Sequence, residues 1–567
     1  MAGIKVKDFF NGRFFEIPKY QRGYAWEKSN IRDLFDDVVE AVESNSNHYI
    51  GTIVLSKDDQ DDEKFYVVDG QQRITTITLM MSALIKQLST RDADFYERVY
   101  LKEEDRYRLQ PLNRDNKFFI DLLEGTVGEP QNKSQRFLTE AEEEIRYKVE
   151  AIGDKLKFLK ALEKLEVMEF VENSEGDAIR IFQTVNDRGK PLSNMEKAKS
   201  LLIYFSNRYL DKKLDTKIND HFSDVFEIYD DIKHIGEELN ITLIRNKDFN
   251  EDNLMRYHFT TFSEEDYDPS ATYVFQFLKN NLTILRNAAE DSYDELEEFI
   301  NSYITSIKEF FSACREVIQR AQTKEKYYKL FVVLNLSATL YPLVAKLEML
   351  GLLDQHLPSE DKKAYTFLDL VELIDVRVYK TRATDPKADI ARFVSYIDQK
   401  TPEEIEGWFR WFNERWMPKE MFQSYLWGSG VYGNRALNHI FISYSEAVSG
   451  KKYGMKELKK LVSKVPNVEH ILSQTPKFSA RALGFRNTEE FLNMENCLGN
   501  LTGLEKALNS AGLNKSALDK TEYYGKSDFS MTKKLGTEIH TNKGFTKKHV
   551  SERTAELGSF CLETWWV

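Results

Sequence analysis

The stretch VVDGQQRITT, residues 67–76, places a short β-branched run directly before the start of an apolar helical pattern. The Asp-Gly pair between them predicts a corner, because glycine accepts backbone conformations that end a strand. A helix that starts at such a corner offers free backbone N–H groups, which together with the helix dipole favour an anion. The polar residues at this junction are Asp69, Gly70, Gln71, Gln72 and Arg73.

On these residues alone, the corner has two interpretations. Arg73, one turn into the helix, carries a guanidinium that can bind a phosphate through two hydrogen bonds. Asp69 is suited to hold water or a metal ion, and Gln71 or Gln72 to position water or contact a base. The alternative is a well-capped helix whose arginine lies on a solvated face.

Strand-like and helical runs alternate around this corner. FFEIP (14–18), HYIGTIVLS (48–56) and KFYVVDG (64–70) are predicted strands, and residues 31–42 follow the helical period. We therefore expect a mixed α/β domain in this part of the chain.

A polar and aromatic segment, KYQRGYAW (19–26), follows the first predicted strand. Aromatic side chains interleaved with an arginine are suited to stack on a base or to follow a nucleic-acid backbone. The alternative is that Tyr24 and Trp26 are core residues and that Arg22 pairs with a nearby aspartate. The residues of this pattern are Tyr20, Gln21, Arg22, Tyr24 and Trp26.

The chain has 567 residues, which is too long for a single hydrophobic core, and we expect about two or three domains. No uncharged apolar run approaches the roughly 18 residues of a membrane span, and the first residues lack the apolar stretch of a secretory signal. The three cysteines are far apart, which argues against a zinc site or a disulfide framework. These features predict a cytoplasmic protein with no membrane partner.

The net charge of −13 argues against nucleic-acid binding only as a global sum, because binding depends on local charge. From Glu505 to Glu556 there are ten Lys and Arg residues against seven Asp and Glu residues. This part of the chain is mildly basic, which permits contact with DNA.

The segment IFQTVNDRGKPLSNMEKAK (181–199) interrupts a mainly helical pattern. Its Asn-Asp-Arg-Gly cluster predicts a turn, and Ser193 and Glu196 then have the spacing of a capping box at the start of a helix. Long amphipathic helices are predicted from about 206 to 400, before short strands return. We expect three domains, at 1–210, 211–404 and 405–567.

Taken in order, IPKYQRGYAW, HYIGTIVL, VVDGQQRITT and IFQTVNDRGKPLS resemble the N-terminal domain of GmrSD-type, modification-dependent (type IV) restriction proteins, which the phosphorothioate-sensing SspE proteins share. The resemblance implies a ParB/sulfiredoxin-like α/β fold that binds and hydrolyses a nucleoside triphosphate. It associates residues 69–73 with nucleotide hydrolysis, and Gln21, Arg22 and Tyr24 with sensing of nucleotide or modified DNA. A nucleotide-side role is also expected for three residues of the last motif, Asn186, Arg188 and Lys190.

Near the other end, VEHILSQTP (468–476) and CLGNLTGLEKALNSAG (497–512) bring together the residue types of a metal-dependent nuclease. Carboxylate and amide oxygens suit Mg²⁺, and an imidazole can take a proton from water. Adjacent Glu469 and His470 on a strand point to opposite faces unless the backbone bends. The alternative is that His470 is an ordinary half-buried histidine.

These two stretches resemble the HNH (His-Me finger, ββα-metal) nuclease domain of the same family. The resemblance implies that His470 is the general base, that Glu469 and Asn509 hold the metal, and that Asn500 braces the β-hairpin. Lys520 matches a late lysine of the family and is expected to contact phosphate, unless it is a solvated helix residue. Where the family usually has proline, this chain has Ser473, which loosens the loop after the base without removing a ligand.

The motifs together predict a multidomain α+β DNA endonuclease or nickase of bacterial anti-phage defence, dependent on a nucleoside triphosphate and on Mg²⁺ or another divalent cation. One alternative is a nucleotide-switched DNA-binding or regulatory protein with a non-catalytic HNH-like domain. Another is an NTPase with a toxin-like role. The DNA modification, the nucleotide, nicking against double-strand cutting and a homo-oligomeric state stay open.

Overall fold

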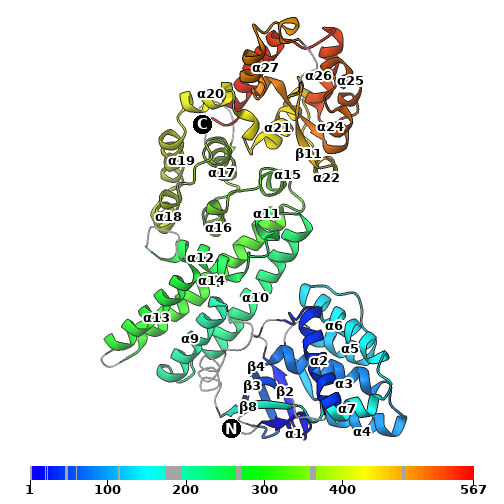
Figure 1. The fold of residues 1–567 in the computed structure, drawn as a ribbon. Helices are drawn as coiled ribbons and strands as arrows, with labels where there is room; N and C mark the ends of the chain where they lie inside the picture. Colours follow the sequence, from blue (N-terminus) through cyan, green and yellow to red (C-terminus); the bar gives the residue numbers. More distant parts are fainter. Residues whose placement is uncertain are drawn as a thin grey trace. The chain divides into compact units, whose positions relative to one another are not determined.

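The computed structural model describes residues 3–18, 21, 23–44, 49–58, 60–112, 115–173, 193–263, 270–289, 292–357, 365–475 and 479–566. The described chain is mixed α+β, as predicted (Figure 1). It divides into two compact units, which are discontinuous in sequence. The first unit comprises Met1–His234, Asn250–Met255 and Pro269–Phe311, and the second comprises Ile235–Phe249, Arg256–Asp268 and Ser312–Val567.

The first unit contains a six-stranded sheet with the order β1-β8-β3-β4-β2-β7. Strand β3 runs antiparallel to β4 and parallel to β8, and β2 runs parallel to both β4 and β7. The strands of this unit are β1 (Ile4–Lys5), β2 (Phe14–Ile17), β3 (Tyr49–Lys57), β4 (Lys64–Asp69), β5 (Lys102–Glu103), β6 (Arg106–Tyr107), β7 (Leu109–Pro111) and β8 (Glu166–Glu172). The three strands predicted from the sequence are confirmed as β2, β3 and β4.

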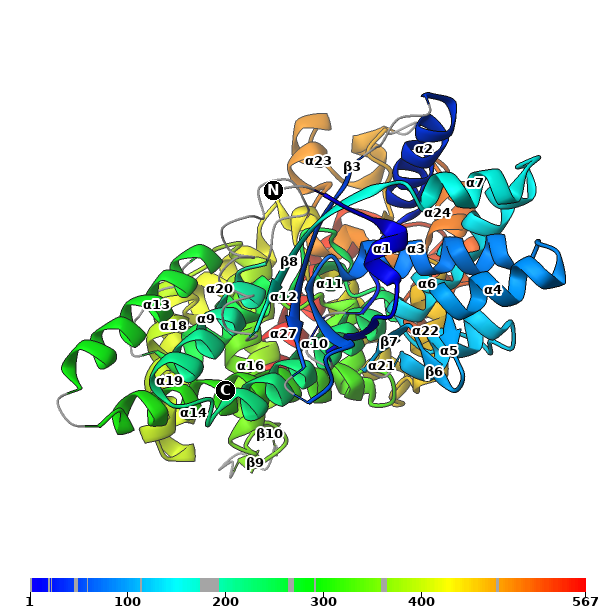
Figure 2. The same ribbon diagram turned by 90° about the horizontal axis from the view of Figure 1, so that it is seen from below.

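Helices of the first unit gather beside this sheet, and α2 to α7 lie on one side of it in both views (Figures 1 and 2). The helices beside the sheet are α1 (Val6–Phe10), α2 (Lys28–Ser44), α3 (Gln71–Ile85), α4 (Thr90–Tyr100), α5 (Asn116–Glu124), α6 (Lys133–Glu150) and α7 (Lys155–Leu162). The same unit contains α9 (Asn194–Tyr209) and α13 (Ala271–Ala288), which pack against each other. Every residue of α3 except Arg73 is buried. The helix is therefore buried on all sides, whereas its sequence pattern predicts burial of one apolar face only.

The predicted start of α9 is confirmed in detail. Ser193 accepts a hydrogen bond from the backbone of Glu196, whose side chain in turn accepts from the backbone of Ser193. This reciprocal pair satisfies two of the N–H groups that a helix start leaves without intrahelical partners. The preceding motif residues Asn186, Arg188 and Lys190 lie outside the described residues.

The predicted run of helices in the middle of the chain is also present. It comprises α10 (Asp215–Glu238), α11 (Thr242–Arg245), α12 (Glu251–Phe262), α14 (Asp294–Arg320), α15 (Glu325–Tyr328), α16 (Tyr341–Met349), α17 (Phe367–Ile374), α18 (Lys387–Tyr396), α19 (Pro402–Trp416) and α20 (Lys419–Trp427), with a short hairpin of β9 (His356–Leu357) and β10 (Tyr365–Thr366). Among the helices in the described ranges, none combines the length and apolar character needed to cross a membrane.

The last part of the second unit is built on the antiparallel pair of β11 and β12. Helix α24 follows β12 directly and packs against both strands, which gives the ββα order that the resemblance implies. The elements are α21 (Leu437–Ser449), α22 (Met455–Ser463), β11 (Pro466–His470), α23 (Thr488–Met494), β12 (Leu501–Glu505), α24 (Lys506–Gly512), α25 (Ala517–Tyr524), α26 (Ser530–Thr541) and α27 (Lys547–Thr564).

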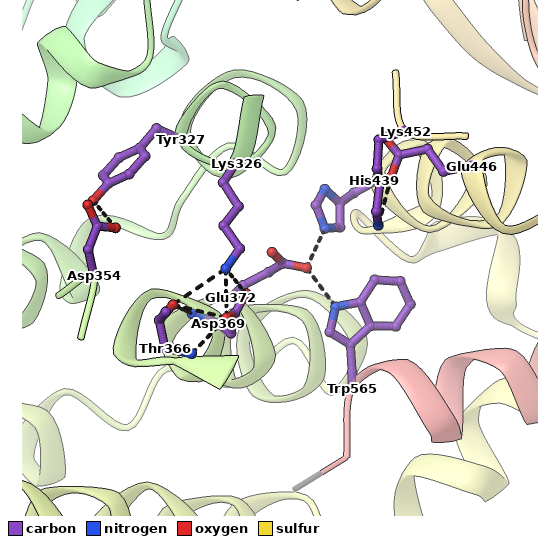
Figure 3. Close-up of polar contacts among 10 residues, drawn as sticks. All are labelled: Lys326, Tyr327, Asp354, Thr366, Asp369, Glu372, His439, Glu446, Lys452 and Trp565. Atoms are coloured by element: carbon purple, nitrogen blue, oxygen red, sulfur yellow. Dashed lines mark hydrogen bonds and ion pairs between the residues drawn. The ribbon is translucent and has the colours of Figure 1, made fainter. Parts of the chain in front are cut away.

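A polar cluster fixes the end of α27 to two other helices of the second unit (Figure 3). The Glu372 carboxylate on α17 accepts a hydrogen bond from Trp565 Nε1 at 2.8 Å and lies 2.9 Å from His439 Nε2 on α21. Burial alone would raise the pKa of Glu372, but the charge of His439 and the two hydrogen bonds hold it at about 2. The ionised carboxylate therefore links α17, α21 and the residue after α27.

Replacing the carboxylate should weaken this link. Glu372→Gln removes the charge, and we expect it to destabilise the second unit by about 2 kcal/mol, the scale of a hydrogen bond to a charged group. The native pKa of about 2 lies below the ordinary value of 4.5, so the contribution is complete above about pH 4.5 and is lost as the pH falls toward 2. Thermal unfolding at several pH values measures this, with the exposed Glu403→Gln as control. An equal effect of both variants at neutral pH would contradict it.

Candidate functional site

The corner before α3 has a backbone that only glycine suits. Gly70 is the N-cap of α3 and has φ of +89°, in the left-handed region. A Cβ atom placed on it would lie 2.9 Å from Ile53 Cγ1 and 3.1 Å from the Thr52 carbonyl oxygen. The Asp-Gly pair therefore ends β4 and starts α3 at once, as the sequence predicts, because Gly70 both turns the chain and approaches β3 closely.

Arg73 does not lie on a solvated helix face. Its Nη1 donates a hydrogen bond to the Thr52 carbonyl oxygen at 2.9 Å, and a Cβ atom on Gly51 would lie 2.5 Å from its guanidinium carbon. Gly51 thus leaves the space in which the guanidinium lies against β3. Burial lowers the pKa of Arg73, and the charge of Asp69 opposes this shift. The guanidinium is therefore fixed in place beside the start of α3.

Gln72 joins α3 to the segment before α2. Its Oε1 accepts a hydrogen bond from the Ala25 backbone at 2.7 Å, and its Nε2 donates to the Gly23 carbonyl oxygen at 3.2 Å. Gln21 Nε2 donates to the carbonyl oxygen of Val68 on β4 at 2.9 Å. Both ends of the Gln72 amide are therefore occupied within the protein, which does not fit the predicted contact with a base or a water.

Tyr24 lies in the core of the first unit. It is 6% exposed, and its hydroxyl is 2.8 Å from Thr76 Oγ1 on α3. Burial raises its pKa, against the opposing hydrogen bond. Trp26 packs partly buried against the same core. Direct stacking of Tyr24 on a base does not fit this placement, because the ring is already packed; the predicted sensing residues Tyr20 and Arg22 lie outside the described residues.

In the second unit, Glu469 and His470 are the last two residues of β11 and contact different neighbours. Glu469 lies opposite Thr502 of β12 and contacts α25, whereas His470 contacts Asn496 and the ring of Tyr432. This is the alternation expected of adjacent residues on a strand.

Lys520 is buried behind the strand rather than exposed to a phosphate. Its Nζ lies 2.6 Å from Glu469 Oε1 and donates to the His470 carbonyl oxygen at 2.6 Å, and its side chain is 2% exposed. Burial raises the pKa of Glu469, and the Lys520 charge opposes this shift. The predicted phosphate contact therefore does not fit this placement, in which Lys520 neutralises the predicted metal ligand and holds the end of β11.

Asn500 joins the end of β11 to the chain before β12. Its Oδ1 accepts from the Leu472 backbone N–H at 2.8 Å, and its Nδ2 donates to the carbonyl oxygens of Leu472 at 3.1 Å and Glu495 at 2.7 Å. The side chain is buried, so these contacts compensate for its loss of water. This geometry suits the bracing role that the resemblance implies.

His470 is held on two sides by residues that the sequence did not single out. Its Nε2 lies 2.9 Å from Asn496 Oδ1, and the centres of its ring and that of Tyr432 are 4.5 Å apart. Burial lowers the pKa of His470, and the hydrogen bond to Asn496 opposes this shift. Ser473, in place of the usual proline, is buried and its hydroxyl donates to the Lys515 carbonyl oxygen at 3.4 Å.

A divalent cation at this site would keep most of its water, because Glu469 and Asn509 are the two predicted protein ligands and Glu469 Oε1 is already paired with Lys520. Within the described ranges, no group of three or more His, Cys, Asp or Glu side chains is arranged to hold a metal ion. A cation here depends on Glu469 and Asn509, which offer carboxylate and amide oxygens of the kind that Mg²⁺ binds. Asn509 is half-buried on α24, and its side chain makes no hydrogen bond to another described residue.

The space that Gly51 leaves for Arg73 is testable by a double-mutant cycle. Gly51 has φ of +117°, so Gly51→Ala adds backbone strain as well as the contact with the guanidinium. In the Arg73→Ala protein, Gly51→Ala should cost only the backbone strain, because the guanidinium is no longer there to be contacted. Urea unfolding should therefore give a coupling free energy between the two changes of about 1 kcal/mol or more. Gly12→Ala, with φ of +67° and no atom within 4 Å, is the control for strain alone. Additive effects of the Gly51 and Arg73 changes would rule out the contact.

Family models match both regions described above. Residues 6–203 match the N-terminal domain of the GmrSD restriction endonuclease, and residues 416–560 match the C-terminal domain of GmrSD restriction endonucleases. The first match includes the corner at α3, and the second includes β11, β12 and α24. No curated protein matches the chain. Because the two matches lie in the family's order and together cover more than half of the chain, it belongs to the GmrSD restriction endonuclease family.

Proposed function

We propose that this protein cuts DNA at the β11–β12–α24 site under the control of a nucleoside triphosphate that is bound and hydrolysed at the corner before α3. Membership of a restriction endonuclease family makes it a nuclease of phage defence with DNA as substrate. The observation that carries the proposal of a working nuclease site is the hairpin braced by Asn500, with His470 held at the end of β11.

At the nuclease site, His470 takes the proton from a water molecule that attacks the phosphorus of the scissile phosphate. The new bond forms between the water oxygen and phosphorus, and the bond from phosphorus to the leaving oxygen breaks; the leaving oxygen keeps the electron pair and takes a proton from solvent. Glu469 and Asn509 are the residues that would hold Mg²⁺, and the ion would stabilise the charge that builds on the phosphate. Lys520 positions Glu469 and the end of β11, instead of binding the substrate itself.

At the corner before α3, the anion is a phosphate of the nucleotide. The first N–H groups of α3 and the guanidinium of Arg73 would bind it, and Asp69 would hold the attacking water or a metal ion. Arg73 is fixed by Thr52 and Gly51, so little of its side-chain entropy is lost when the nucleotide binds.

We further assign the recognition of a DNA modification to the segment before α2, in which the side chains of Gln21 and Trp26 are partly exposed. Tyr24 is buried and does not contact DNA in this proposal. A change in the segment would reach the corner before α3 through its hydrogen bonds to Gln72 and to Val68 of β4. A cytoplasmic location fits the chemistry, since the three cysteines are free and buried.

Cleavage assays should separate the two sites. Purified protein with Mg²⁺ and each of ATP, GTP, CTP and UTP is incubated with plain and differently modified phage DNA. His470→Ala should lower cutting by roughly 10²- to 10⁴-fold, the usual contribution of a general base, and leave nucleotide hydrolysis intact. Arg73→Ala should lower nucleotide hydrolysis and, with it, cutting.

Two results would count against this assignment. If no DNA is cut and the His470→Ala protein behaves like the wild type, the nuclease proposal is wrong. If DNA binding and host protection depend on Arg73 but not on His470, the protein is a nucleotide-switched regulator with a non-catalytic C-terminal domain.

The metal requirement is a separate prediction. Chelation with EDTA should abolish cutting, and added Mg²⁺ or Mn²⁺ should restore it. Asn509→Ala should raise the Mg²⁺ concentration for half-maximal cutting by at least about 10-fold, since loss of a ligand should cost no less than loss of its outer-shell partner. Ser510→Ala, on the exposed side of the same helix, is the control. Full cutting in the presence of the chelator would exclude a metal-dependent site.

A further inference from the structure

We propose that Asn496 is a positioning residue that holds His470 with a proton on Nε2, so that Nδ1 carries the lone pair that accepts a proton from water. This inference rests on the proposed nuclease function and assigns a role to a residue outside the predicted site. Its basis is the 2.9 Å separation of Asn496 Oδ1 and His470 Nε2.

The orientation of the Asn496 amide follows from its contact with Glu495. Its Nδ2 lies 3.4 Å from Oε1 of Glu495, and a carboxylate accepts hydrogen bonds but has none to donate. The amide oxygen therefore faces His470, and a flipped amide would lose the contact with Glu495.

This orientation decides which nitrogen of His470 carries the proton. Because Asn496 Oδ1 is an acceptor only, the hydrogen bond needs a proton on Nε2. A neutral imidazole has one such proton, so its lone pair is on Nδ1. Nδ1 makes no hydrogen bond to another residue in the described part of the chain, which leaves it available for water.

Asn496 is itself fixed to the hairpin that carries His470. The carbonyl oxygen of Glu495, the preceding residue, accepts from Asn500 Nδ2 at 2.7 Å, and Asn500 also binds both backbone groups of Leu472. Two turns of backbone hydrogen bonds, from Cys497 to Met494 and from Asn500 to Cys497, hold the chain between them. Asn500 therefore sets the separation of Asn496 and His470 through the backbone on each side.

Tyr432 limits the remaining freedom of the imidazole. Its ring lies at 46° to that of His470, with ring centres 4.5 Å apart. With one edge bound to Asn496 and Tyr432 packed beside the ring, rotation of His470 would break the hydrogen bond. His470, the proposed general base, is thus oriented before the substrate binds. A positioning residue lowers the barrier in this way, because the entropy cost of orienting the base does not arise during the reaction.

The kinetic test uses the full-length protein with Mg²⁺, nucleotide and the DNA that it cuts. Asn496→Leu keeps the approximate size but removes the acceptor, and kcat should fall on the order of 10- to 100-fold with KM little changed. Asn496→Asp alone places a carboxylate against Glu495, so it should also be impaired. The double variant Asn496→Asp with Glu495→Gln restores one donor and one acceptor and should recover most of kcat. Asn493→Leu, exposed on α23, is the matched control.

A spectroscopic arm tests the inference without cutting. Imidazole ¹⁵N NMR, with the His470 signals identified by their loss in His470→Gln, should show a protonated Nε2 and an unprotonated Nδ1 in the wild type at neutral pH. The Asn496→Leu protein should show a mixture of the two tautomers. If the wild type does not cut DNA but shows this tautomer, the proposed function fails and the positioning role stands. A protonated Nδ1 in the wild type, or unchanged kcat in Asn496→Leu, would overturn the role of Asn496.

Discussion

The C-terminal site depends on the buried amide of Asn500. One side chain satisfies both backbone groups of Leu472, just after β11, and the carbonyl oxygen of Glu495, before β12. The end of β11 and the chain before β12 are joined by a long connection, so the connection alone does not fix the distance between them. The amide replaces water at three backbone groups that would otherwise be buried without partners, and each unsatisfied group would cost roughly 1–3 kcal/mol.

Support for Asn500 extends outward through α27. The Gly499 backbone donates to Thr554 Oγ1 at 3.0 Å, and the absence of a Cβ atom on Gly499 lets the backbone of α27 approach at Val550. The far end of α27 is fixed by Trp565 to the ionised Glu372. The hairpin that carries His470 is thus held by a helix that is itself bound at both ends. This arrangement agrees with a site built on rigid elements, where a small displacement of the proposed base, His470, would lower the rate sharply.

The sequence predicted the parts of the fold that local chemistry determines. Period-2 and helical patterns located β2, β3, β4 and α3, and the capping residues located the start of α9. It did not reveal that Arg73 lies in the space left by Gly51, or that Gln72 is occupied by a backbone segment, because both depend on tertiary contacts across the sheet. Asn496 had no signal of its own. Its role arises from the path of the long connection, which brings Asn496 back beside His470.

The DGQQR motif and the C-terminal motif both show that residues of one motif can have different roles. In the DGQQR motif, both ends of the Gln72 amide bind the protein itself, so the proposed nucleotide chemistry rests on the α3 N-terminus, Arg73 and Asp69. In the C-terminal motif, Lys520 and Asn500 likewise bind the protein itself, whereas His470 keeps one ring nitrogen for water. In both places, buried polar residues make fixed contacts within the protein and position the residue that is proposed to react, since a buried polar group needs a fixed partner.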